Sequence, residues 1–121
     1  MLCTRIIDEQ KSGGDRHKQS DCRGTTDAPI IISTHACGSL TDKVLQYTID
    51  VQAASVAVMP CCYTGTDAGV PYGLRRMLGV SLSADIRRSF HLQDHDYHVD
   101  FAAIPKAITP MNRLILAERR K

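Results

Sequence analysis

The chain has 121 residues, of which 43% are hydrophobic and 23% charged, with 15 lysines and arginines against 13 aspartates and glutamates. This length fits one domain, and the apolar fraction is sufficient for a hydrophobic core. A formal charge of +2 argues against a dedicated nucleic-acid binder, because such proteins concentrate far more positive charge on one face. The longest apolar runs, such as Val56–Met59, are too short to span a membrane.

The cysteines bear on the compartment in which the protein works. There are five of them, an odd number, and two are adjacent at Cys61 and Cys62. The first residues also lack the apolar stretch of a secretory signal. We therefore expect a cytoplasmic protein with free thiols rather than a disulfide framework.

The first quarter of the chain has little to bury. The segment Leu2–Ile7 is short and apolar and could form one strand. Residues 8–29 contain three glycines and charges of both signs, which is typical of a surface loop or a linker. The sequence predicts an N-terminal arm or linker over residues 1–29, partly disordered, followed by a folded part over residues 30–121.

A strand–helix–strand unit begins after this arm. The β-branched run Ile30–Thr34 is apolar on both faces, as a central parallel strand would be. Ser39 and Asp42 match a capping box at the start of a helix, whose inner stripe is Leu40, Val44, Leu45 and Thr48. A second buried strand, Ser55–Met59, follows. Two apolar strands joined by a helix predict a parallel βαβ unit with a right-handed crossover.

The C-terminal half alternates between loops and regular elements. A loop follows Tyr63 and could contain one helical turn around Leu74–Leu78. The next helix is predicted over Ser83–Gln93, with an inner stripe of Leu82, Ile86 and Phe90. Two strands close the chain at Tyr97–Ile104 and Arg113–Ala117, and they must pair antiparallel because no helix fits between them. The predicted fold class is α/β: a parallel βαβ unit, a helix and a C-terminal antiparallel strand pair.

Two motifs sit where the parallel strands are predicted to end, at Thr34–Gly38 and at Met59–Tyr63. In open α/β sheets, ligands bind at the carboxyl ends of the strands. If the two strands are neighbours, four reactive side chains meet across one crevice, namely His35, Cys37, Cys61 and Cys62. These four residues are our candidates for catalysis.

Several chemistries could use such a set. One imidazole and three thiolates are an acceptable zinc set, but the spacing lacks Cys-x-x-Cys pairs, so pocket-lining thiols are favoured and no metal ligand is assigned. A reactive thiol is a further alternative, because Cys37 precedes a helix start and His35 lies two residues away. A zinc deaminase is disfavoured, since Cys37 stands where the catalytic glutamate would be and Cys62 follows Cys61 directly.

Other polar groups have simpler interpretations. The histidines and aspartates of residues 91–98 are interpreted as a solvated turn, and the pairs Arg75–Arg76 and Arg87–Arg88 as solvated helix faces. The chain contains neither Gly-x-Gly-x-x-Gly nor Gly-x-x-x-x-Gly-Lys, so no phosphate-binding loop is predicted.

The runs IIISTHACGSLTDKVL, VAVMPCCYTG and YHVDFAAIPKAITPMNRLILAERR together resemble the methyltransferase-domain family of the class I, S-adenosylmethionine-dependent superfamily. The resemblance covers residues 30–120 and implies a partial Rossmann-like fold whose last two strands are antiparallel. It also implies that Thr34, His35 and Ala36 line the cofactor and methyl-transfer pocket together with Cys37, and that Pro60, Cys61 and Cys62 border the substrate. His35 would act as a base or as a hydrogen-bond anchor.

The family holds S-adenosylmethionine mainly with three earlier strands and a glycine-rich loop, which this sequence lacks. The resemblance therefore implies the C-terminal half of the domain, incomplete for cofactor binding on its own. The strand over residues 30–34 would then have an exposed edge, which predicts pairing with Leu2–Ile7, with a second copy or with a missing N-terminal half. No residue supports RNA or any other particular methyl acceptor. The alternatives are a non-catalytic Rossmann-like binding or dimerisation module, and a zinc or reactive-thiol site.

Overall fold

The computed structural model describes residues 4–7, 28–63 and 69–121. Its helices and strands follow the chain in the order β1 Thr4–Ile7, β2 Ile30–Cys37, α1 Leu40–Asp50, β3 Ser55–Cys62, α2 Tyr72–Asp94, β4 Tyr97–Ala103 and β5 Arg113–Arg119. Within this part of the chain, no helix is long and apolar enough to cross a lipid bilayer.

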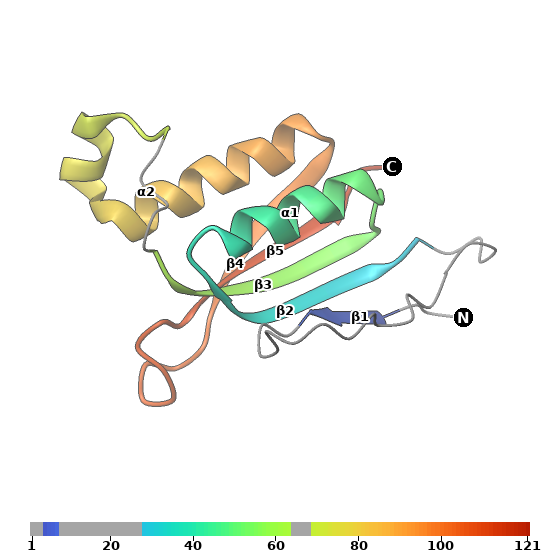
Figure 1. Ribbon diagram of the computed structural model, residues 1–121, viewed down its shortest axis with the longest axis horizontal. Helices are drawn as coiled ribbons and strands as arrows, with labels where there is room; N and C mark the ends of the chain where they lie inside the picture. The colour runs from blue at the N-terminus through green and yellow to red at the C-terminus, as the bar shows by residue number, and fades with distance from the viewer. Residues whose placement is uncertain (1–3, 8–27, 64–68) are drawn as a thin grey trace, which may run out of the picture.

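The strands form one mixed five-stranded sheet in the order β1-β2-β3-β5-β4. The first three strands are parallel, and β5 runs antiparallel to both of its neighbours, β3 and β4. Both helices lie on the same face of the sheet, α1 over β2 and β3 and α2 over β4 and β5 (Figure 1). The predicted parallel βαβ unit and the predicted C-terminal antiparallel pair are confirmed.

The two parallel strands of that unit are longer than predicted. We expected them to end at Thr34 and Met59, but β2 continues to Cys37 and β3 to Cys62. The ladder continues with irregularities, because the pairing register shifts between Ser33 and Ala36 and again between Ala36 and Cys37. Both motifs therefore belong to the paired strand ends, not to turns beyond them.

The strand expected at an open edge is covered. β1 pairs with β2 from Thr4 opposite Ile30 to Ile7 opposite Ser33. The expectation of an exposed edge over residues 30–34 is therefore wrong for residues 30–33, because the N-terminal strand occupies it. Pairing with the N-terminal strand is one of the three alternatives that the sequence predicted for this edge. Pairing with a second copy or with a missing N-terminal half stays a prediction. The rest of the predicted arm, residues 8–27, lies outside the described residues.

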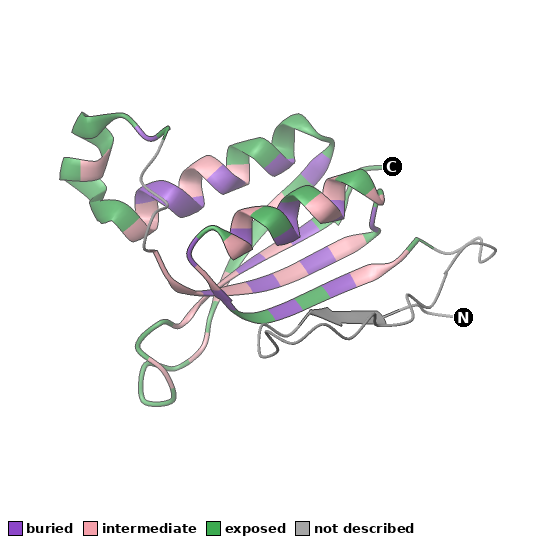
Figure 2. Cartoon of the chain, viewed as in Figure 1, coloured by how far each residue is buried: buried purple, intermediate pink, exposed green. Residues whose placement is uncertain are grey.

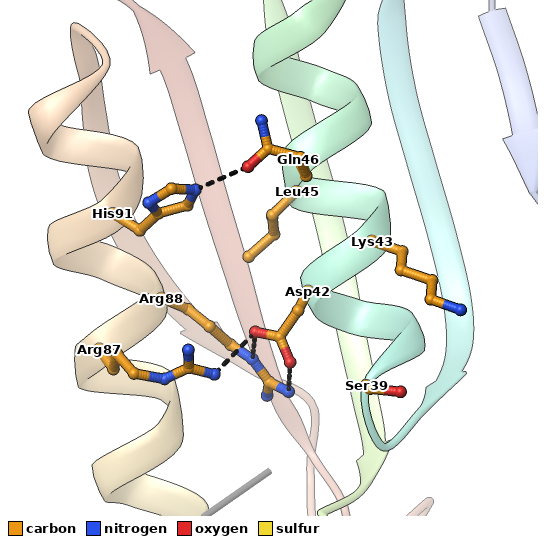
Figure 3. Close-up of a pocket in the computed structure, with 8 residues that line it drawn as sticks. All are labelled: Ser39, Asp42, Lys43, Leu45, Gln46, Arg87, Arg88 and His91. Carbon is orange, nitrogen blue, oxygen red and sulfur yellow. Dashed lines mark hydrogen bonds and ion pairs between the residues drawn. The ribbon is translucent and has the colours of Figure 1, made fainter. Parts of the chain in front are cut away.

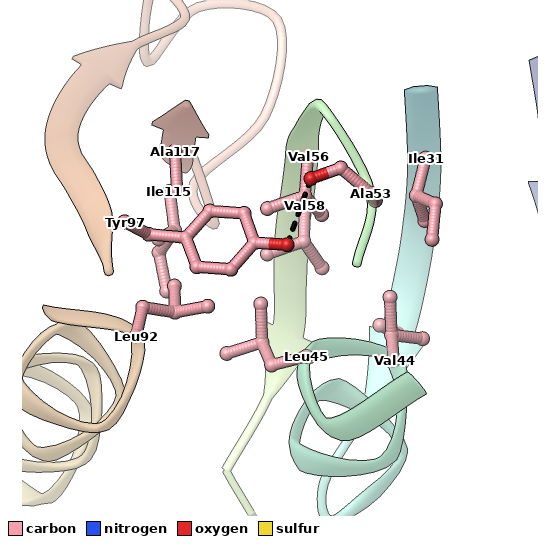
Figure 4. Packing of buried hydrophobic residues seen from close by; sticks show 11 residues of the cluster. Ile31, Val44, Leu45, Ala53, Val56, Val58, Leu92, Tyr97, Ile115 and Ala117 are labelled. Atoms are coloured by element: carbon pink, nitrogen blue, oxygen red, sulfur yellow. Dashed lines mark hydrogen bonds between the residues drawn. The ribbon is translucent and has the colours of Figure 1, made fainter. Parts of the chain in front are cut away.

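The hydrophobic core fills the space between the sheet and the helices. Buried and more exposed residues alternate along β2 and β3 (Figure 2), as expected when one face of each strand packs on the helices. The core includes Val44 and Leu45 from α1, Leu92 from α2 and Ile115 from β5 (Figure 4). The spacing of apolar residues in α1 thus predicted its buried face.

Tyr97 shows how a polar group is accommodated in this core. Its side chain is 1% exposed, and its hydroxyl donates a hydrogen bond to the carbonyl oxygen of Ala53 at 2.8 Å (Figure 4). The carbonyl oxygen of Thr48, at 3.2 Å, is a second acceptor for the same hydroxyl. Burial raises the pKa of Tyr97, because the phenolate would lose its hydration. The neutral hydroxyl therefore ties β4 to the end of α1 and to the turn that follows it.

The start of α1 differs from the expected capping box. Ser39 occupies the N-cap position, but its side chain makes no capping hydrogen bond and its backbone is already helical, with φ −70° and ψ −10°. A capping serine usually has an extended backbone, which directs its oxygen to the free amides of the first turn. The Asp42 carboxylate instead accepts hydrogen bonds from α2, as described below.

The second helix combines both segments predicted between Tyr63 and Gln93. It runs from Tyr72 to Asp94, with a break at Gly79, where φ is 80° and ψ is 163°. The predicted inner stripe is wrong: Phe90 is 58% exposed, and the buried positions of this helix are Ser83, Ala84, Asp85, Arg88 and Leu92. The spacing of apolar residues cannot predict a buried face that includes two charged residues.

Candidate functional site

The three cysteines of the candidate site lie at the carboxyl ends of β2 and β3. Cys37 is the register partner of Cys62 in the parallel ladder, and the Gly38 amide donates a hydrogen bond to the Cys62 carbonyl at 3.1 Å. The sulfur atoms of Cys37, Cys61 and Cys62 all lie within 4.8 Å of one another. The prediction that the two cysteine motifs meet is confirmed.

The bonding state of these cysteines differs from the expectation. Cys37 and Cys61 form a disulfide, with 5.3 Å between their Cα atoms, and Cys62 is a free, half-buried thiol. The prediction of free thiols is therefore wrong for this pair. Adjacent parallel strands bring residues 24 positions apart to a distance that a disulfide spans, which cysteine counting could not reveal.

The other predicted site residues divide into exposed and buried ones. Thr34 and His35 are exposed, and His35 has a left-handed backbone with φ 56°. Ala36 is fully buried in the hydrophobic core. Among the described residues, His35 is not in the group whose ligand atoms cluster around Cys37. His35 therefore lies at the irregular part of β2 and is open to solvent.

Two buried hydrogen bonds fix the segment that carries Cys37. The Thr41 hydroxyl, in the first turn of α1, donates to the Ala36 carbonyl at 2.7 Å. The Arg88 guanidinium, from α2, donates to the Gly38 carbonyl at 3.1 Å. Both helices therefore hold the backbone on either side of Cys37, which gives this end of β2 a defined position.

Arg88 is the centre of a buried ion-pair network. Its guanidinium donates to Asp42 through Nε at 3.0 Å and Nη2 at 3.1 Å, and to Asp85 through Nη1 at 3.0 Å. Figure 3 shows Arg87 and Arg88 extending from α2 toward Asp42 on α1. Burial disfavours the charged guanidinium, but hydrogen bonds and charges from Asp42 and Asp85 outweigh this effect and raise the pKa of Arg88.

The interpretation of Arg87–Arg88 as a solvated face is wrong for Arg88. The side chain of Arg88 is 1% exposed and that of Asp85 is 0% exposed, whereas Arg87 is 40% exposed. The sequence contains one indication of an ion pair here: the spacing of Asp85 and Arg88 places opposite charges on one side of a helix. The partner that buries them, Asp42, comes from a different helix and could not be identified from that spacing.

The network continues to the residue that follows Cys62. The Tyr63 hydroxyl donates to Asp85 at 2.7 Å, and the same carboxylate oxygen pairs with Arg113 Nε at 3.0 Å. Burial, followed by the hydrogen bond to Asp85, raises the pKa of Tyr63 to about 12. The Arg88 guanidinium also lies 5.5 Å from the centre of the Tyr63 ring, within the range of a cation–π contact. Asp85 therefore links the ends of β3 and β5 to α2.

Among the described residues, two cavities border this region. One, of about 440 Å³, lies between α1 and α2 and is lined by Ser39, Asp42, Lys43, Leu45, Gln46, Arg87, Arg88 and His91 (Figure 3). The other, of about 140 Å³, lies at the carboxyl edge of the parallel strands and is lined by Pro60, Tyr63, Ser81, Pro110, Met111, Asn112 and Arg113.

Neither set of lining residues fits S-adenosylmethionine by itself. Sites for molecules of this size usually have at least about 300 Å³, which exceeds the 140 Å³ of the cavity at the strand ends. The larger cavity carries three cationic side chains, and its carboxylate, Asp42, is already paired with Arg87 and Arg88. A sulfonium cation has no free carboxylate to pair with among these residues.

Comparison with known proteins adds one match. A family described as a methyltransferase domain matches residues 5–68. This segment contains both cysteine motifs and ends before α2. No curated protein matches the chain, and no solved structure does.

Proposed function

This chain belongs to the methyltransferase-domain family, since the matched segment spans more than half of its 121 residues, and we propose that it serves S-adenosylmethionine-dependent methyl transfer. The observation that carries the proposal is that the family match includes the paired ends of β2 and β3. In open α/β sheets this edge is where ligands bind. The mixed sheet, with its parallel βαβ unit and terminal antiparallel pair, supports a partial Rossmann-like fold.

The proposed role of this edge is to position the methyl acceptor. S-adenosylmethionine, when bound, supplies a methyl group on a sulfonium sulfur, and alignment of the acceptor with it accounts for much of the rate. His35 is exposed at the end of β2 and would hold the acceptor by a hydrogen bond or remove its proton. Thr34 is exposed beside it, and both side chains would contact the cofactor. The cysteines would border the substrate.

Calorimetry with S-adenosylmethionine tests this proposal on the full chain. Because the lining residues described above do not enclose the cofactor, we expect weak but saturable binding, with a Kd of about 0.1–1 mM. His35→Ala should weaken it about tenfold or more. His98→Ala is the matched control, since His98 is also exposed but lies on β4, at the far edge of the sheet, and it should leave the Kd unchanged. Equal affinity in both variants would contradict the role of His35.

A second candidate function is a non-catalytic module that keeps this fold for binding or dimerisation. The small cavity at the strand ends favours it. Among the described strands β1 is the outermost on its side, and its outer backbone groups could pair with a second copy. Absence of heat at millimolar S-adenosylmethionine, together with a concentration-dependent dimer in sedimentation, would select this alternative over methyl transfer.

A further inference from the structure

We propose that Cys37, Cys61 and Cys62, when reduced, bind one thiophilic divalent cation of the zinc class, and that the Cys37–Cys61 disulfide is the metal-free, oxidised form of the same site. Three sulfur atoms that all lie within 4.8 Å of one another carry this inference. It does not depend on methyl transfer, because the cysteines would bind the cation whether or not the protein acts as an enzyme.

The distances suit a thiolate-bound metal. Zinc–sulfur bonds are about 2.3 Å long, so two sulfurs of a tetrahedral site lie about 3.8 Å apart. The three cysteine sulfurs lie no more than about an ångström beyond that spacing, and the two that form the disulfide lie closer than it. Small rotations of the side chains can therefore complete the site once the disulfide is opened, without a change in the backbone.

The backbone around the cysteines is held by contacts independent of the disulfide. Cys37 and Cys62 are paired in the parallel ladder, and the Gly38 amide binds the Cys62 carbonyl. Arg88 binds the Gly38 carbonyl from the other side. Because these hydrogen bonds remain when the disulfide opens, the three sulfur ligands stay close together in the reduced protein.

The surroundings of Cys37 suit the negative charge of a thiolate-bound cation. Helix α1 begins at Leu40, three residues after Cys37, and the positive end of a helix dipole stabilises nearby anions. Arg88 adds a buried positive charge behind Gly38. Three thiolates and a divalent cation have a net charge of minus one, which these groups help to balance.

His35 is not a ligand in this arrangement. It lies outside the group of clustered ligand atoms among the described residues and is exposed. Three protein ligands leave the fourth position of a tetrahedral zinc open to water or to another small ligand. The inferred site therefore differs from the four-ligand set that the sequence suggested, in which His35 completes the coordination.

The two forms of the site interconvert by a balanced two-electron exchange. A dithiol reductant gives up two electrons and two protons, its own sulfurs join as a disulfide, and Cys37 and Cys61 become thiols. The cation then binds the three sulfurs and displaces their protons to solvent. Oxidation by a disulfide reverses the first step and releases the metal.

Metal titration of the reduced and oxidised full chain tests the inference. Cys3 and Cys22, which lie outside the described residues, are first replaced by serine so that they cannot bind the metal. The protein is reduced with a dithiol, freed of it under anaerobic conditions, and titrated with Cd²⁺ alone while the thiolate-to-cadmium absorption is followed. We expect about one equivalent of Cd²⁺ bound to the reduced form, and less than about a tenth of an equivalent in the oxidised form.

The oxidised protein is the matched control, because it has the same sequence and fold as the reduced one. Cys62→Ser should lower the cadmium affinity at least about 100-fold while the Cys37–Cys61 disulfide still forms in the oxidised variant. Cadmium binding that is absent from the reduced protein, equal in both oxidation states, or unaffected by Cys62→Ser would overturn the proposal.

Discussion

Two regions of the protein interior hold the helices in place, and they differ in the type of contact. Around Leu45, Leu92 and Tyr97 the contacts are mostly apolar, and the buried Tyr97 hydroxyl is bonded to a backbone carbonyl. Toward the carboxyl ends of β2 and β3, the contact between the helices is ionic, with Arg88 and Asp85 almost fully buried. The two regions share the same helices and sheet, so their different sensitivity to substitution can be compared directly.

The apolar and the ionic region contribute differently to stability and to the geometry of the structure. Apolar burial stabilises in proportion to area and is weakly directional. A buried ion pair adds little net stability over an apolar pair of similar volume, but removing one partner is expensive because the other charge stays buried. The ionic region therefore acts mainly to fix the geometry of Gly38 and Tyr63, next to the cysteines.

Breaking the ionic region at its centre should have the largest effect. Arg88→Met leaves Asp85 buried, with Arg113 and Tyr63 as its remaining side-chain partners among the described residues, and we expect the free energy of unfolding to fall by about 3–5 kcal/mol in urea denaturation. Arg87→Met is the control, since this half-exposed side chain makes one ion pair with Asp42, and it should lower stability by no more than about 1 kcal/mol. Equal losses in the two variants would contradict the distinction.

Breaking the apolar region should cost somewhat less. Leu45→Ala removes a side chain that is 1% exposed at the centre of the core, so the loss should be about 2–4 kcal/mol, set by the cavity that remains. Leu78→Ala is the matched control, because Leu78 is 39% exposed, and its loss should stay below about 1 kcal/mol. Comparison of urea midpoints for the two variants measures the difference. A tolerated Leu45→Ala would mean that the helices do not depend on this core.

Removal of the Tyr97 hydroxyl measures how much this buried polar group contributes to stability in the apolar region. Tyr97→Phe keeps the ring but leaves the Ala53 carbonyl without its side-chain donor, and we expect a loss of about 1–2 kcal/mol in urea denaturation. Tyr72→Phe serves as a control, since Tyr72 is 72% exposed, and should change stability by less than about 0.5 kcal/mol. If both variants were neutral, the buried hydroxyl would contribute nothing.

The last expected effect is confined to alkaline pH. Folding raises the pKa of Tyr63 from 10.0 to about 12, so the folded state binds its proton more tightly than the unfolded state does. The resulting stabilisation is complete below pH 10 and is lost as the pH rises to about 12. The difference in unfolding free energy between wild type and Tyr63→Phe should therefore shrink between these two pH values, in denaturant titrations. A constant difference would contradict the raised pKa of Tyr63.

The apolar region was largely predictable from sequence, and the ionic region was not. Short apolar runs predicted the parallel strands, and their adjacency placed Cys37 beside Cys61. Apolar spacing failed in α2, where the charged pair Asp85 and Arg88 is buried and Phe90 is exposed. Such a face depends on Asp42 from another helix, a contact distant in sequence. The disulfide was missed for the same reason, since it follows from strand register.

Photo-crosslinking of radiolabelled S-adenosylmethionine, followed by peptide mapping, tests most directly whether the ends of β2 and β3 form the functional site. We predict that the label is saturable, is displaced by unlabelled cofactor and maps to residues 34–37 or 60–63. Specific labelling confined to the helices that line the larger cavity, at Gln46 or His91 for example, would place the site elsewhere and contradict the account. The same conclusion would follow if no residue were labelled specifically.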